Sequence, residues 1–81
     1  MRILVLAFAT IRDVLGSSSL SVTITDGATV GDLLIHLQET YPELARWLGS
    51  TRVAVNCEYV GGDTVLHDGD EVALIPPVSG G

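Results

Sequence analysis

The chain ends in two glycines, and the carboxylate of Gly81 is the group in this sequence best suited to group-transfer chemistry. Pro76 and Pro77 precede this tail and favour an extended exit from a strand. The residues that follow are small, so they can enter a narrow channel and present the carboxylate to the catalytic groups of another protein. An inert, frayed terminus is the alternative, because most chain ends are of that kind.

A free carboxylate is a poor electrophile, because its pKa of about 3.3–3.7 leaves it ionised at neutral pH. Activation through an acyl adenylate needs ATP, but the sequence has no Walker-type loop and no glycine fingerprint that opens a helix. Gly61 and Gly62 precede Asp63 rather than a helical pattern, which predicts a turn. We therefore expect the chain to bind no cofactor and to be a carrier loaded by a separate ATP-using enzyme, not an enzyme on its own.

The charge of the chain is unbalanced and points to a protein partner. Ten acidic residues face four arginines (Arg2, Arg12, Arg46 and Arg52), which gives a net charge of −6 and leaves no lysine. An acidic surface repels phosphate backbones, so we expect no nucleic-acid partner and a protein partner with basic residues. A carrier without lysine cannot acylate its own side chains, although compositional drift also explains the absence.

The remaining reactive side chains do not form a site. Cys57 is the only cysteine, which excludes an internal disulfide, fits a cytoplasmic location and predicts a small packing residue. His36 is expected in solvent and His67 in a turn, so the sequence predicts no metal site. No stretch approaches the roughly 18 apolar residues of a membrane span, so no membrane partner is expected.

The first half of the chain predicts two strands and a helix. Residues 3–9 form a nearly continuous apolar run, typical of a strand covered on both faces. Residues 10–15 are expected to form a short connector, with one helical turn as the alternative, which Gly16 stops before an alternating strand over 20–25. Thr29 and Asp32 form a capping-box pattern at the start of a helix that Pro42 ends. Its predicted buried stripe comprises Val30, Leu33, Leu34 and Leu37.

The second half adds a short helical piece over 43–48, a strand over 53–56, a short strand, and a last strand over 71–75. Asp68-Gly69 predicts a turn before the last strand. If the first and last strands pair in parallel, the fold is α+β of the β-grasp (ubiquitin-like) class, with a mixed sheet packed on one main helix plus a short helix. We expect one domain over residues 1–77 and a flexible tail over 78–81.

Two motifs resemble the family of small subunits of molybdopterin synthase, which are ubiquitin-like sulfur carriers. One is the C-terminal stretch from Asp68-Gly69-Asp70-Glu71-Val72 to Ile75-Pro76-Pro77-Val78-Ser79-Gly80-Gly81. The other is the segment Phe8-Ala9-Thr10-Ile11-Arg12-Asp13-Val14-Leu15-Gly16, with its aromatic-Ala pair and its Arg-acidic pair. The resemblance spans the whole chain.

The resemblance implies a function in molybdenum cofactor biosynthesis. Gly81 would be adenylated by an E1-like enzyme, converted to a thiocarboxylate with sulfur from a sulfurtransferase, and inserted into the large subunit of molybdopterin synthase, where the sulfur passes to a pyranopterin precursor. The assembly would be a heterotetramer around a large-subunit dimer. The implied partner contacts are Phe8, Arg12, Ile75, Pro76, Pro77, Val78, Ser79 and Gly80.

Several alternatives stay open at this point. Ile75 stands where relatives often carry an aromatic residue, Phe8 equally suits a core position, and Arg12 could instead pair with Asp13. The chain could also be a sulfur carrier of the thiamine pathway, although such carriers are usually shorter and lack both motifs. It could be a ubiquitin-like protein modifier joined to lysines through Gly81, or an interaction module with an inert tail.

Overall fold

A computed structural model, which describes residues 1–77, contains one mixed sheet of five strands. The strands are β1 (Arg2–Ala7), β2 (Ser19–Thr23), β3 (Arg52–Val55), β4 (Glu58–Val60) and β5 (Glu71–Ile75). Their order in space is β2-β1-β5-β3-β4. The central pair, β1 and β5, is parallel, and the other neighbouring pairs are antiparallel. The predicted parallel pairing of the first and last strands is confirmed.

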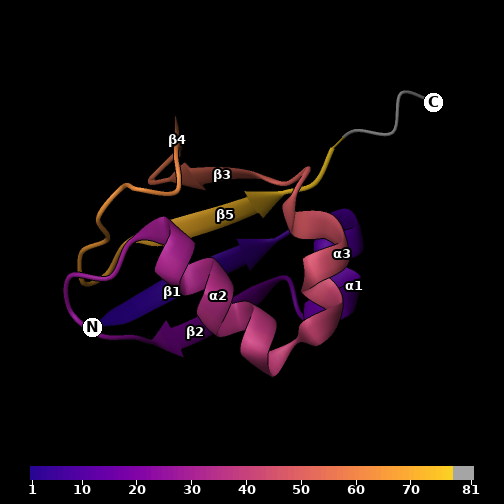
Figure 1. Cartoon of the computed structure of the whole chain (residues 1–81), viewed down its shortest axis with the longest axis horizontal. Helices are drawn as coiled ribbons and strands as arrows, with labels where there is room; N and C mark the ends of the chain where they lie inside the picture. Colours follow the sequence, from indigo (N-terminus) through magenta and orange to yellow (C-terminus); the bar gives the residue numbers. More distant parts are fainter. Residues whose placement is uncertain (78–81) are drawn as a thin grey trace.

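The main helix, α2 (Val30–Thr40), crosses one face of this sheet, as Figure 1 shows. Its predicted capping box is present, since the Thr29 N–H donates to the Asp32 carboxylate at 2.9 Å and the Asp32 N–H donates to Thr29 Oγ1 at 3.2 Å. The helix ends before Pro42. Three short pieces follow the ends of β1 and α2, namely α1 (Ala9–Leu15), the 3-10 turn η1 (Pro42–Leu44) and α3 (Ala45–Leu48).

The core lies between α2 and the face of the sheet that α2 covers. Alternate residues of the strands contribute side chains from the sheet, and the predicted stripe of α2 contributes them from the helix. Val30, Leu33 and Leu37 are buried, and Leu34 packs against them partly buried. The fully buried large side chains are Ile3, Val5, Ile11, Val30, Leu33, Leu37, Leu44, Leu66, Val72 and Leu74.

The prediction for the first strand is wrong in two respects. The strand ends at Ala7 rather than at residue 9, because helix α1 already begins at Ala9. The connector over residues 10–15 adopts the helical alternative, and Gly16, with φ +76°, caps the helix after Leu15. The strand is also covered on one face only, because Ile3, Val5 and Ala7 are buried while Leu4 is exposed. The apolar run led to the wrong prediction because helices cover only one face of this sheet, so apolar residues on the other face stay exposed.

The prediction that Cys57 is a packing residue is also wrong. Cys57 is exposed, and with Asn56 it forms the two-residue turn between β3 and β4. Both residues have positive φ, +50° at Asn56 and +72° at Cys57, as such hairpins require. The predicted turn at Gly69 is present, with φ +85°.

Within residues 1–77, none of the helices has the length and apolar character needed to cross a membrane.

Candidate functional site

The candidate site begins at the end of β5, just before the C-terminal tail. Ile75 is the last residue of β5 and lies opposite Arg52 of β3. Pro76 is buried, whereas Pro77 is exposed. Val78, Ser79, Gly80 and the predicted reactive Gly81 lie outside the described residues. The described chain therefore delivers its last residue, Pro77, to the surface at the end of a central strand.

Phe8 is brought to the same end of the sheet as Ile75. Because β1 and β5 are parallel, with Ala7 opposite Leu74, the residues that follow both strands lie at one edge of the molecule. Phe8 is 48% exposed, so the core position considered for it is not adopted. Ala9 has φ +47°, a left-handed conformation that costs a residue with a Cβ about 1–2 kcal/mol. This backbone turns the chain directly into α1 after Phe8.

Arg12 lies in the last turn of α1 and its side chain is exposed. The alternative pairing with Asp13 is not seen, because Arg12 forms no ion pair within residues 1–77. Its guanidinium is thus available to a partner carboxylate, four residues beyond Phe8 on the same short helix.

The uncovered face of the sheet forms an apolar surface beside this end, and we call it the open face. Leu6, Ala73, Ala54 and Tyr59 are successive partners across β1, β5, β3 and β4. Leu4 is 39% exposed and Tyr59 is 58% exposed. Exposed apolar side chains gathered on one face are typical of a protein–protein interface. We define the open face as Leu4, Leu6, Ala54, Tyr59, Ala73 and Ile75, of which Ala54 is buried, and the register places Glu71 opposite Leu4 at its edge.

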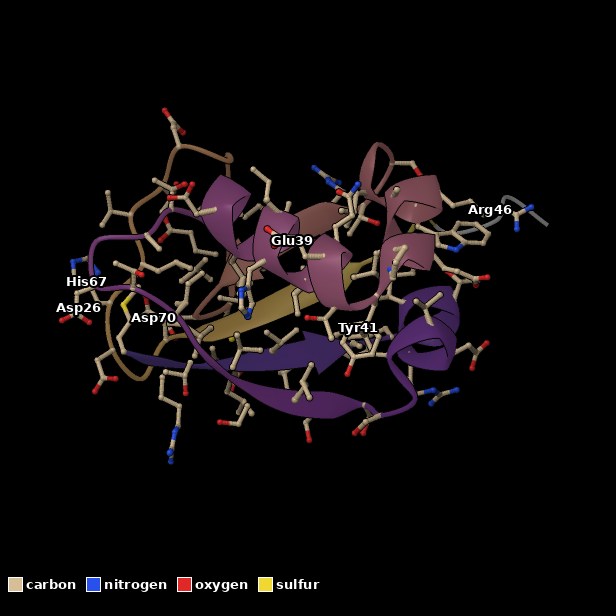
Figure 2. All side chains as sticks on the ribbon, turned by 60° about the horizontal axis from the view of Figure 1, so that its bottom comes forward. Asp26, Glu39, Tyr41, Arg46, His67 and Asp70 are labelled. Carbon is tan, nitrogen blue, oxygen red and sulfur yellow. The ribbon has the colours of Figure 1, made fainter. Side chains whose placement is uncertain are left out.

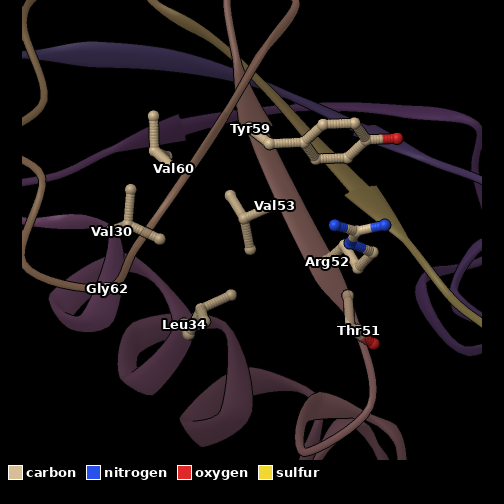
Figure 3. A pocket seen from close by; sticks show the side chains of 8 residues that line it. All are labelled: Val30, Leu34, Thr51, Arg52, Val53, Tyr59, Val60 and Gly62. Atoms are coloured by element: carbon tan, nitrogen blue, oxygen red, sulfur yellow. The ribbon is translucent and has the colours of Figure 1, made fainter.

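A hollow of about 410 Å³ adjoins the open face at the β4 edge. In Figure 3, Val30 and Leu34 approach it from α2 and Val53 from β3, and the Arg52 guanidinium lies beside the Tyr59 ring. The guanidinium carbon is 4.6 Å from the ring centroid, a cation–π distance. Because the hollow has an apolar floor and one cation at its rim, it can accept a partner's apolar side chain and an adjacent carboxylate.

A polar network occupies the opposite end of β5, where the strand begins. The Asp70 carboxylate accepts a hydrogen bond from the His67 N–H at 2.8 Å and another from Asn56 Nδ2 at 3.0 Å. The first of these, helped by the second, lowers the pKa of Asp70 below its ordinary value. Figure 2 shows His67 and Asp70 together at the end of the molecule far from α1 and α3. This network fastens the turn before β5, and we assign it to structure.

Residues 1–77 hold no group of three or more acidic, histidine or cysteine side chains that could bind a metal ion. His36 is exposed on α2, as expected, and Cys57 lies on the β3–β4 turn. The candidate features of the described residues are therefore the end of β5, the open face and the hollow at the β4 edge.

Sequence reasoning singled out the tail, Phe8 and Arg12, which stay predictions, and it did not single out Leu4, Tyr59 or Arg52. For Leu4 a signal was present in β1, where Leu4 and Leu6 alternate with Ile3 and Val5. It could be interpreted only with the knowledge that one face of the sheet is uncovered.

Comparisons with known proteins agree with this geometry. The model of the ThiS family matches residues 5–81. The molybdopterin synthase sulfur carrier subunit of Chlamydomonas reinhardtii is 42% identical over all of both chains. That of Escherichia coli is 42% identical over 95% of this chain and 96% of its own. Small archaeal modifier protein 3 of Haloferax volcanii is 40% identical over 91% of this chain and 92% of its own.

Solved structures share the fold. The crystal structure of SAMP1 from Haloferax volcanii superposes with a TM-score of 0.89, at 34% identity over all of both chains. A complex of subunits 1 and 2 of the molybdopterin-converting factor from Helicobacter pylori contains a chain with a TM-score of 0.75, at 30% identity over all of both chains. A ubiquitin from Caldiarchaeum subterraneum, 21% identical over 100% of this chain and 98% of its own, has a TM-score of 0.66. The predicted β-grasp, ubiquitin-like fold is confirmed.

Proposed function

The chain belongs to the ThiS family, among the molybdopterin synthase sulfur carrier subunits, and from this membership we propose that it carries sulfur for molybdopterin synthase on the carboxylate of Gly81. The observation that carries the proposal is the place where the described chain ends. β5 ends at Ile75, and Pro77 is exposed at the edge of the sheet where β1 also ends, just before Phe8. A partner that covers this edge is placed to receive the residues beyond Pro77.

The chemistry requires two steps at Gly81, both carried out by other proteins. In the first, a carboxylate oxygen attacks the α-phosphorus of ATP in an E1-like adenylating enzyme, and pyrophosphate leaves. In the second, hydrosulfide that a thiol has released from the persulfide of a sulfurtransferase attacks the carbonyl carbon, and AMP leaves to give a thiocarboxylate. The protein acts as the sulfur-donor subunit, because the described residues offer docking surfaces rather than catalytic groups.

The large subunit of molybdopterin synthase is the proposed acceptor, in a heterotetramer with a central large-subunit dimer. The open face would supply the apolar centre of that interface, and Arg12 and Arg52 would supply charge at its rim. Such an arrangement follows the usual pattern of an apolar centre with a polar rim. There the thiocarboxylate sulfur would pass to a pyranopterin precursor. The Helicobacter pylori complex of two subunits supports a pairing of this kind.

A role as a protein modifier is the second candidate, because the Haloferax volcanii relative named small archaeal modifier protein 3 matches almost as well as the carriers. Both functions begin with adenylation of the same carboxylate. They differ in the final acceptor, which is a sulfur atom in one case and a lysine amine in the other. A ladder of conjugates in cell extract, absent when Gly81 is deleted, would favour the modifier.

The test is an intact-mass spectrum after incubation with ATP, a sulfide source and the cognate activating enzyme. We expect a mass gain equal to the exchange of one oxygen for one sulfur, located on the C-terminal peptide. The chain lacking Gly81 is the matched control and should gain nothing, although its fold is unchanged.

An unmodified chain would contradict sulfur loading, provided that the activating enzyme loads a control carrier in the same assay. If the chain gains sulfur but no pyranopterin product forms in the presence of the large subunit, the result would indicate that the carrier serves another pathway, such as thiamine synthesis.

A further inference from the structure

A groove runs between strand β2 and helix α2, at the edge of the sheet opposite to β4. It consists of two adjoining hollows of about 360 and 210 Å³, and His36 lines both. In Figure 2 the two elements run across the view, with Asp26 toward one end, Tyr41 toward the other and Glu39 on the helix between them. The lining residues of apolar character are Leu20, Val22, Ile24, Ile35, Leu37 and Tyr41.

The wall of the groove formed by β2 is an unpaired strand edge, because β2 stands last in the strand order. Met1 and Ile24 exchange backbone hydrogen bonds at 2.7 and 2.9 Å, and the Ala7 N–H donates to the Ser18 carbonyl at 2.9 Å. Pairs that exchange such bonds alternate with pairs that do not along an antiparallel ladder. The register therefore directs the N–H and C=O groups of Ser21 and Thr23 away from β1, toward the open edge.

An extended peptide is the ligand that satisfies both features together. Its backbone can pair with the outward groups of Ser21 and Thr23, as in other cases of strand addition to a sheet edge. Its alternate side chains would then lie over the apolar groove, where Leu20 and Tyr41 are partly buried and Ile35 is 59% exposed.

The charge of the groove selects a basic peptide. Its lining includes Asp26, Asp32 and Glu39 and no arginine, in a chain that has no lysine. The Met1 ammonium lies 3.0 Å from Asp26, and Asp32 is engaged in the capping box. Glu39, exposed on α2, forms no ion pair within residues 1–77 and is the carboxylate left for a cation of the ligand.

We propose that the groove between β2 and α2 binds an extended basic segment of a partner protein, which adds a strand to β2. The groove lies on the α2 side of the sheet and the open face lies on the other side, and β1 separates β2 from the end of β5. The inference therefore goes beyond the proposed sulfur transfer. A protein bound here leaves Phe8, Pro77 and the open face accessible to a second partner.

The test uses a short blocked peptide of alternating lysine and valine, titrated into the ¹⁵N-labelled full chain and followed by NMR. We expect the amide signals of Ser21 and Thr23 to shift and their hydrogen exchange to slow, while those of Tyr59 and Ala73 stay in place. The same peptide with glutamate in place of lysine is the ligand control and should not bind.

Ser21→Pro is the informative variant, because it removes an outward N–H from an edge strand, where proline is tolerated. We expect the peptide's dissociation constant to rise about tenfold or more, since a backbone hydrogen bond is lost and the added strand is blocked. Ser21→Ala keeps the N–H and should bind as the unmodified chain does. Thermal unfolding checks that each variant is folded, and loading of sulfur on Gly81 should be unchanged in both.

Glu39→Lys tests the charge without altering β2, and we expect it to weaken the lysine peptide and to allow the glutamate peptide to bind. Equal binding by Ser21→Pro and Ser21→Ala, or shifts confined to the open face, would overturn the proposed strand addition. An unchanged preference for lysine in Glu39→Lys would overturn the assignment of a basic ligand.

Discussion

At the scale of single residues, Asp70 connects two segments that are distant in sequence. Its carboxylate holds the His67 N–H within the turn before β5, and it holds the amide of Asn56 beyond the end of β3. Asn56 in turn accepts a hydrogen bond from the Glu71 N–H at 3.1 Å and donates its own N–H to the Glu71 carbonyl at 2.8 Å. One carboxylate thus fastens the start of the strand that ends in the tail.

Asp70→Asn should make the stability of the protein less dependent on pH in acid. The hydrogen bonds from His67 and Asn56 lower the pKa of Asp70 in the folded state, below the ordinary value of 3.8. The stabilisation is therefore complete above that ordinary value and is lost as the pH falls through the lower, folded-state pKa. Urea unfolding from pH 7 down to pH 2 should show a stability difference between the two proteins that shrinks in acid.

Asp63→Asn is the matched control for this series, because its exposed carboxylate accepts no hydrogen bond within the described chain. A difference between Asp70→Asn and the unmodified protein that stays constant at every pH would show that the ionised carboxylate contributes nothing specific.

At the scale of elements, the β3–β4 hairpin is strained at its turn. Asn56 tolerates the left-handed conformation, but Cys57, at φ +72°, carries a Cβ in a conformation that glycine adopts freely. The pair Asn-Gly is the sequence that two-residue turns of this type prefer. The exposed position of Cys57 leaves no packing interaction of its side chain with the core to offset that strain.

Cys57→Gly should stabilise the fold by about 0.5–1 kcal/mol, because the relief of a left-handed residue exceeds the entropy that glycine loses on folding. For a domain of this size the melting temperature should rise by roughly 2–8 °C. Differential scanning calorimetry under reducing conditions measures the change. Cys57→Ala removes the thiol but keeps the Cβ, so it should melt as the unmodified protein does; an equal rise in both variants would assign the effect to the thiol.

At the scale of the whole molecule, the two faces of the sheet differ, because one forms the core and the other is exposed. The face toward α2 carries Ile3, Val5, Val72 and Leu74, all fully buried. The opposite face carries exposed apolar residues that contribute little to the core. In β1 both faces carry apolar residues, but the helices of the described chain cover only one of them.

Leu37→Ala should therefore reduce the stability of the protein, whereas Leu4→Ala should reduce its binding to a partner. Leu37 is 1% exposed, and its truncation should cost about 2–5 kcal/mol of unfolding free energy. Leu4 is 39% exposed, so its truncation should cost well under about 1 kcal/mol. It should, however, weaken binding to the large subunit of a cognate molybdopterin synthase by about fivefold or more. Urea unfolding and calorimetric titration measure the two quantities, and full affinity in Leu4→Ala would exclude the open face from the interface.

The elements that could be predicted from the sequence are those fixed by neighbours along the chain. The helix over 30–40 follows from the Thr29–Asp32 capping box and the apolar stripe, which act within a few residues of each other. The last strand, 71–75, was predicted with its observed bounds because Gly69 turns the chain before it and Pro76 stops it after. The assignment of chemistry to Gly81 also rests on local sequence alone, and it stays a prediction.

Tertiary structure alone decided which residues meet and which faces remain open. The uncovered face of β1, the common edge at which β1 and β5 end, and the groove along β2 all depend on pairings between strands that are separated in the sequence. Local periodicity records that a side chain is apolar, but it cannot record whether a helix or a partner covers it. That choice is made when α2 packs on one face of the sheet, because a chain of this length can cover only one.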